Sequence, residues 1–153
     1  AYELSASQRK SGGRSGGIKI SSPIVFAIDR QRSNGKWRYS VRIGMTPKVY
    51  SDARFIEGDR FDVQFDPDSR MAKIVRVNSG GWMATPTGRE KSARRVMKFA
   101  WYEGMPSVDR TVGCQVVSIE TNTITFQLPE DVSFKENLRL DAEKQKEGLK
   151  LAL

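Results

Sequence analysis

Basic and aromatic side chains are interleaved in two stretches of the chain, roughly fifty residues apart. The first stretch contributes Arg30, Arg32, Lys36, Trp37, Arg38, Tyr39 and Arg42, and the second contributes Trp82, Arg89, Lys91, Arg94, Arg95, Lys98 and Trp101. Cationic side chains bind phosphate groups and release counterions, whereas flat aromatic rings stack on bases. The combination indicates a nucleic-acid-binding surface.

The two residue types are expected to play separate roles on that surface. The expected phosphate contacts are Arg38, Arg42, Arg94, Arg95 and Lys98, and the candidate stacking rings are Trp37, Tyr39, Trp82 and Trp101. In the competing interpretation the rings belong to the core and the arginines form a solvated outer face, and we expect about half of the rings to be core. Three tryptophans beside basic residues, without an evident recognition helix, favour single-stranded DNA over duplex.

The net charge supports a polyanionic partner. It is +8, with an isoelectric point near 9.8. From Pro129 onward five basic residues meet six acidic ones, so the first 128 residues carry +9. A surface of that sign attracts nucleic acid. The alternative is a structural or adaptor protein whose charge serves solubility.

Catalytic chemistry is poorly represented. The chain has no histidine and one cysteine, Cys114, which excludes zinc sites and histidine-based acid–base catalysis. Asp59, Asp66 and Asp68 leave a carboxylate hydrolase or an oxygen-only metal site as an alternative, although acids are also common in turns. No phosphate-binding loop or dinucleotide fingerprint is present. We therefore predict a non-enzyme with neither cofactor nor metal.

The element that organises the chain is a hairpin predicted over residues 58–77. Phe61, Val63 and Phe65 alternate with polar residues, which is the pattern of a half-buried strand. Residues 66–69 supply turn chemistry, and a more apolar strand over residues 71–77 returns.

Weaker patterns predict the remaining elements. A second hairpin is expected over residues 113–129 with its turn at 120–123, and its apolar face should bury Cys114 as a reduced thiol. Alternation over residues 37–43 predicts another strand, preceded by a short strand at 24–28 and a polar loop at 29–36. A short helix is expected at 51–56.

These elements predict an all-β or β-rich α+β fold: a curved antiparallel sheet or partly open barrel of about six short strands with a C-terminal helix. Residues 1–17 read as a flexible basic segment, 18–132 as the β-rich domain and 133–153 as a charged amphipathic helix that could bind a protein partner. The domain could comprise two hairpin-based halves, 18–78 and 92–132. Exposed sheet edges predict a homo-oligomer, a dimer or higher.

Two resemblances bear on function. The segment from Ile56 to Val63, followed by a turn and Lys73-Ile74, resembles the swapped-hairpin domain of AbrB-type transition-state regulators. That resemblance implies two chains interlaced into one barrel whose arginines contact duplex DNA. The overall layout, with its size, basic Gly/Ser-rich start and basic–aromatic interleaving, resembles small early phage proteins that bind single-stranded DNA and assist a phage RNA polymerase.

The sequence therefore predicts non-catalytic binding of nucleic acid, with single-stranded DNA favoured, in replication or transcription. The alternatives are a sequence-specific duplex regulator of the swapped-hairpin type and an adaptor protein that binds no nucleic acid. No apolar run approaches the ~18 residues that span a membrane, so an intracellular, cytoplasmic location is expected.

Overall fold

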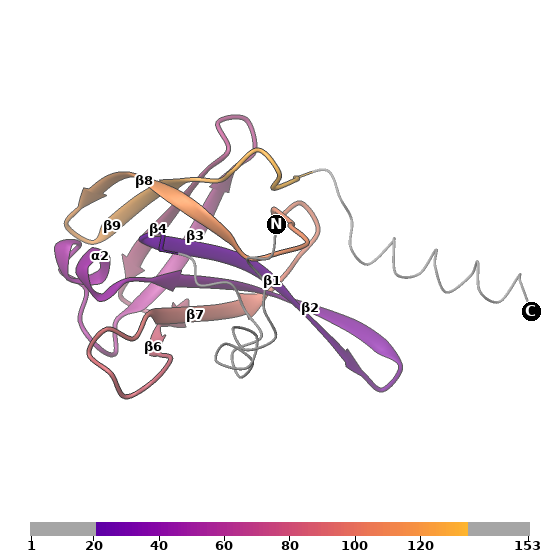
Figure 1. Ribbon diagram of the computed structural model, residues 1–153, viewed down its shortest axis with the longest axis horizontal. Coiled ribbons are helices and arrows are strands. Elements are labelled where there is room, and N and C mark those ends of the chain that lie inside the picture. Colours follow the sequence, from indigo (N-terminus) through magenta and orange to yellow (C-terminus); the bar gives the residue numbers. More distant parts are fainter. Residues whose placement is uncertain (1–20, 135–153) are drawn as a thin grey trace, which may run out of the picture.

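A computed structural model describes residues 21–134, which form nine strands and one short helix (Figure 1). The elements are β1 (Ile24–Ser33), β2 (Lys36–Met45), α2 (Pro47–Asp52), β3 (Arg60–Asp66), β4 (Met71–Val77), β5 (Trp82–Met83), β6 (Thr85–Pro86), β7 (Arg95–Ala100), β8 (Val112–Glu120) and β9 (Thr123–Gln127). The fold of these residues is β-rich, as the sequence patterns predicted, and α2 is its one helix. The strand number is nine rather than the expected six.

All nine strands belong to one antiparallel sheet in the order β5-β3-β4-β9-β8-β1-β2-β7-β6. The two edge strands, β5 and β6, are separated in the chain only by Ala84. This single segment pairs with β3 on one side, through Trp82 and Phe61, and with β7 on the other, through Thr85 and Val96. The sheet therefore curls into a nearly closed barrel, because its two edges are one continuous piece of chain.

A bulge in β8 makes the opposite corner of the barrel. The first residues of β8 pair with β1, as in the Ile24–Cys114 pair, and the later ones pair with β9. The register shifts between Val116 and Ser118, and the extra residue, Val117, is exposed. A bulge bends a strand and increases its twist, which lets β8 belong to both halves of the barrel.

The barrel interior is filled by the alternating apolar residues of its strands. Val41, Ile43 and Met45 of β2 are fully buried, as are Phe61 of β3 and Met97 of β7. Each is followed by a residue of the opposite face, which is the period of two expected of strands. The predicted strand over 37–43 is confirmed, and so is the one with Phe61, Val63 and Phe65 on a single face.

Both predicted hairpins are present. The β3–β4 hairpin turns at Asp66, whose carboxylate accepts hydrogen bonds from the Asp68 amide (3.1 Å) and the Ser69 hydroxyl (2.7 Å). The β8–β9 hairpin turns at Thr121 and Asn122, inside the predicted range. The Cys114 thiol is buried, as predicted, and burial raises its pKa to about 12.

Two local predictions are wrong. Residues 29–33 continue β1 instead of forming a loop, because they remain paired with β2 as far as Ser33 and Lys36. The short helix spans Pro47–Asp52 rather than 51–56, because Thr46 caps it with a hydroxyl that accepts from the Val49 amide at 3.4 Å.

The predicted domain limits can be placed only in part. Strands from the two suggested halves interleave in the sheet, since β1 pairs with β8, β2 with β7 and β4 with β9. The N-terminal basic segment and nearly all of the predicted C-terminal helix lie outside the described residues. Across positions 21–134, no helix has the length and apolar character needed to cross a membrane.

Candidate nucleic-acid interface

The β1 and β2 strands extend well beyond the barrel as a two-stranded ribbon, which points to the lower right in Figure 1. Toward the tip of the ribbon, β1 pairs with β8 only as far as Phe26, and β2 pairs with β7 only as far as Ser40. We call the protruding part, residues 28–39, the β1–β2 ribbon. Its turn residues Asn34 (φ 51°) and Gly35 (φ 74°) both adopt the left-handed conformation of a tight type I′ hairpin, which matches the twist of the flanking strands.

The β1–β2 ribbon is strongly cationic. Four basic side chains project from it, and residues 30–38 include no acid: Arg30, Arg32, Lys36 and Arg38. All four residues are exposed, and none forms an ion pair with another residue of the described range. Positive charge that no acid of residues 21–134 neutralises in an ion pair is available for phosphate groups.

One aromatic ring of the ribbon is exposed to solvent. Trp37 is 45% exposed, and the Arg32 guanidinium lies over its ring, 5.8 Å from the centroid. The two residues are direct cross-strand partners. Tyr39 is half-buried and meets Trp101 edge-to-face with 6.4 Å between centroids. Trp37 therefore presents a ring to a ligand, whereas Tyr39 joins the ribbon to the barrel.

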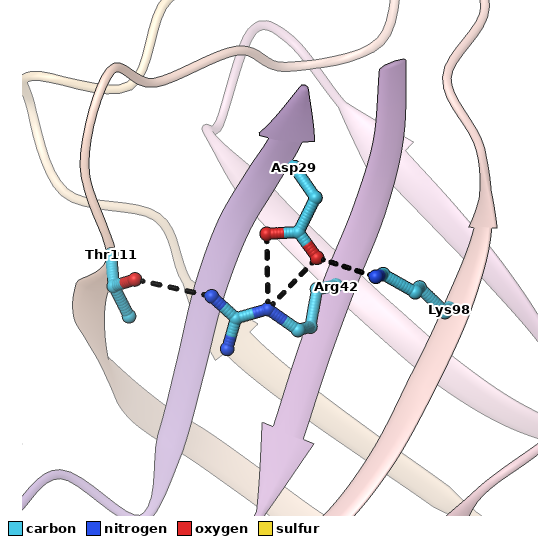
Figure 2. Close-up of polar contacts among 4 residues, drawn as sticks. All are labelled: Asp29, Arg42, Lys98 and Thr111. Carbon is cyan, nitrogen blue, oxygen red and sulfur yellow. Dashed lines mark hydrogen bonds and ion pairs between the residues drawn. The ribbon is translucent and has the colours of Figure 1, made fainter. Parts of the chain in front are cut away.

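At the base of the ribbon, Asp29, Arg42, Lys98 and Thr111 form a polar group that we call the Asp29 cluster (Figure 2). The Arg42 Nε atom donates to both oxygens of Asp29, at 3.3 and 3.1 Å, and the Lys98 Nζ atom lies 2.9 Å from Oδ2. Arg42 Nη2 also donates to the Thr111 hydroxyl at 3.3 Å. Two predicted phosphate contacts, Arg42 and Lys98, are thus held by one carboxylate.

The electrostatics of Asp29 follow from these contacts. Partial burial acts to raise the pKa of the Asp29 carboxyl, but the hydrogen bond from Lys98 and the positive charges of Arg42 and Lys98 outweigh it. The net result is a pKa below the ordinary value of 3.8. Asp29 is therefore ionised at neutral pH and partly cancels the charge of the two cations.

Arg94 and Arg95 lie at the other end of β7, away from the ribbon. Arg94 donates to the backbone carbonyls of Ser22 (2.6 Å) and Pro23 (3.4 Å), and its partial burial lowers its pKa. Arg95 donates to the Ala93 carbonyl at 3.4 Å. Arg94 therefore holds the residues that lead into β1. Arg94 and Arg95 lie apart from the cations of the first stretch, whereas Lys98 lies beside Arg42 at the base of the ribbon.

The second stretch differs from its sequence prediction in its tryptophans as well. Trp101 is fully buried, and its indole nitrogen donates to the Pro106 carbonyl at 3.1 Å. Trp82 is half-buried and stacks on Phe99 with 4.7 Å between centroids. Both rings pack against the barrel, Trp101 completely and Trp82 in part, whereas Arg89 and Lys91 are exposed in the β6–β7 loop. The alternation of Met97, Phe99 and Trp101 could have revealed that Trp101 faces inward.

Sequence reasoning missed two participants. Thr111 carries no motif, and it reaches Arg42 only because β8 begins beside β1. Asp29 was likewise not among the predicted site residues, although its carboxylate holds Arg42 and Lys98.

Comparisons with protein-family models, with curated protein sequences and with solved structures find no match to this chain. The site must therefore be judged from its geometry. Within the described residues, no group of acidic or cysteine side chains is arranged to hold a metal ion. Asp59 instead pairs with Arg76 at 3.5 Å and accepts from the Ile56 amide at 2.8 Å.

Proposed function

We propose that this protein binds nucleic acid without catalysis, single-stranded DNA before duplex, and that the β1–β2 ribbon is the principal contact. The observation that carries the proposal is the combination of four exposed cations, no acid between residues 30 and 38, and one exposed indole on a projecting element. Each phosphate that the cations neutralise releases a counterion, which supplies affinity independent of sequence. Such binding suits a protein of replication or transcription.

Trp37 is the reason for placing single strands first. An exposed ring among cations can stack on any unpaired base, and such stacking contributes about 1–3 kcal/mol per base. A base inside a duplex already stacks on its neighbours and offers its face less readily. Trp101 is buried and Trp82 is half-buried against Phe99, so Trp37 is the tryptophan with the most exposed ring for stacking.

The shape of the ribbon favours a second candidate, binding of duplex DNA. The major groove of B-DNA admits a two-stranded β-ribbon, and arginine can donate two hydrogen bonds to guanine there. Arg30 and Arg32 come from one strand of the ribbon and Arg38 from the other, so both strands could contact a groove. This candidate corresponds to the sequence-specific duplex regulator suggested by the swapped-hairpin resemblance.

The test is a tryptophan fluorescence titration with oligo(dT) and, separately, with the oligo(dT)·oligo(dA) duplex, at two salt concentrations. We expect quenching by the single strand, weaker binding at higher salt, and loss of most of the quenching in Trp37→Phe. A clear preference for duplex would support the second candidate. Absence of binding to either at low salt would exclude both and favour an adaptor protein.

A further inference from the structure

We propose that Arg42 and Lys98 form a phosphate subsite at the base of the β1–β2 ribbon, with Thr111 orienting Arg42, and that Asp29 occupies this subsite when nucleic acid is absent. The inference rests on the proposed function. In it the Asp29 carboxylate competes with a phosphate of the nucleic acid for the same two cations. A bound strand would exchange one of its phosphates for the carboxylate.

The donors around Asp29 are those that a phosphate requires. A guanidinium and an ammonium group converge on one oxyanion, with Arg42 Nε at 3.1 Å and Lys98 Nζ at 2.9 Å from Oδ2. The Thr111 hydroxyl accepts from Arg42 Nη2 at 3.3 Å and so helps to orient the guanidinium. Figure 2 shows Lys98 and Thr111 approaching the Asp29–Arg42 pair from opposite sides. Carboxylate and phosphate oxygens accept hydrogen bonds from the same cationic donors, and arginine in particular serves both.

The Asp29 cluster is open to a ligand from solution. The side chains of Asp29 and Arg42 are each 32% exposed, and that of Lys98 is 57% exposed. Two cations against one carboxylate leave the cluster with a surplus of one positive charge. A phosphate therefore meets an attractive field, and exchange requires only that exposed side chains rotate.

The Asp29 cluster also lies where a nucleic-acid strand bound along the ribbon would reach it. Arg38 and Arg42 are four residues apart on β2, so their side chains leave the same face of the strand, and Lys98 is the cross-strand partner of Arg42. A phosphate backbone that follows Arg38 down the ribbon would next meet Arg42 and Lys98. The Asp29 carboxylate is the group that limits binding at this point.

Removal of the Asp29 charge provides the test. Asp29→Asn keeps the size of the side chain and frees both cations, and Asp68→Asn is the matched control. Asp68 lies in the exposed β3–β4 turn and forms no ion pair in the part of the chain that the structure describes. Both substitutions change the net charge equally, so only a local effect separates them.

Affinity of each variant for fluorescein-labelled oligo(dT) is measured by anisotropy over a range of salt concentrations. We expect Asp29→Asn to bind roughly threefold to tenfold more tightly than the wild type, with a steeper salt dependence by about 0.7 for one added phosphate contact. Asp68→Asn should match the wild type. Adding Lys98→Gln to Asp29→Asn should abolish most of the gain.

Failure of the inference and failure of the proposed function give different results. If the wild type does not bind oligo(dT) at low salt, the proposed function fails. If it binds and Asp29→Asn equals Asp68→Asn, only the subsite is disproved. Weaker binding of Asp29→Asn would overturn the subsite too, because Asp29 would then hold the cations in place. Thermal unfolding confirms that each variant is folded.

A measurement on the wild type covers the case in which Asp29→Asn does not fold. The ¹³C resonance of the Asp29 carboxyl can be titrated with and without oligo(dT). Displacement by phosphate removes the contacts that lower the pKa of Asp29, so the pKa should rise on binding. An unchanged pKa in the saturated complex would contradict the exchange.

Discussion

Arg32 and Trp37 face each other across the β1–β2 ladder, with the guanidinium carbon 5.8 Å from the centre of the indole ring. The contact joins a phosphate-binding group and a stacking ring in one pair on the protruding ribbon. A cation held over an exposed aromatic ring stabilises that arrangement of the two side chains by about 0.5–1 kcal/mol. The ring is therefore partly ordered before a base arrives, which reduces the entropic cost of stacking.

Replacement of Trp37 separates stacking from folding. Trp37→Ala should reduce affinity for oligo(dT) by about 1–3 kcal/mol, or about fivefold to 150-fold, because the stacking surface is lost. The unfolding free energy should change by no more than about 0.5 kcal/mol, since the ring lies outside the barrel. Trp37→Phe should retain most of the affinity. Anisotropy titrations measure the effect, and equal affinities for Trp37→Ala and the wild type would rule out stacking by this residue.

The strand that closes the barrel depends on a close backbone contact at Gly81. A Cβ atom there would lie 2.2 Å from the Phe61 carbonyl oxygen, whereas one on neighbouring Gly80 would meet nothing within 4 Å. Both residues have positive φ, 67° for Gly81 and 71° for Gly80. Gly80→Ala should cost about 1–2 kcal/mol from backbone strain alone. Gly81→Ala should cost at least about 3 kcal/mol, because β5 must also move away from β3.

Urea unfolding of the two glycine variants provides the comparison. Equal losses of stability would mean that β5 does not need to approach β3 closely, and the account of barrel closure by residues 82–86 would then be wrong.

The acid dependence of stability should show the contribution of Asp29. Its pKa is lower in the folded protein than the ordinary 3.8, so the ion pairs stabilise the fold fully above that value. The contribution is lost as the pH falls through the folded pKa. The difference in unfolding free energy between the wild type and Asp29→Asn should therefore be constant near neutrality and shrink below about pH 4.

Denaturant unfolding across that pH range measures the difference. Taking the difference between the two proteins cancels the pH dependence that other acids contribute to both. Asp66 is one such acid, since its pKa is also lowered, chiefly by the hydrogen bond from the Ser69 hydroxyl. A difference that stays constant to low pH would show that the ion pairs do not contribute to stability.

The sequence was most informative where the strands form the barrel. Phe61 and Val63 alternate with polar residues because one face of β3 is core and the other is solvent, and this pattern requires no knowledge of the partner strand. The turn at Asp66 was predictable for the same reason, since its hydrogen bonds stay within three residues. Barrel closure was not predictable, because β5 and β6 have only two residues each and their partners are distant in sequence.

The candidate site was predicted less completely. The polar second half of β1 resembled a loop because the ribbon leaves the barrel and has no apolar core to cover. The sequence pointed to the cations of the ribbon. The ion pair between Asp29 and Lys98, however, depends on how β7 is aligned with β2, and the local sequence does not reveal that register. The partial burial of Trp82 could not be predicted for the same reason, since its partner Phe99 belongs to β7.

The central claim is that the β1–β2 ribbon holds the phosphates. The decisive measurement is the salt dependence of oligo(dT) affinity for a ribbon variant, in which Arg30, Arg32, Lys36 and Arg38 are all replaced by Gln. Its control carries the same replacement at four exposed cations elsewhere: Lys48, Arg54, Arg60 and Lys73.

Because each phosphate contact on a single strand contributes about 0.7 to the slope of log affinity against log salt, the ribbon variant should lose up to about 3 from that slope. Its affinity at low salt should fall by about a hundredfold or more, whereas the control should keep the slope of the wild type. Equal slopes for the ribbon variant and the wild type would contradict the account, and so would equal losses in the two variants.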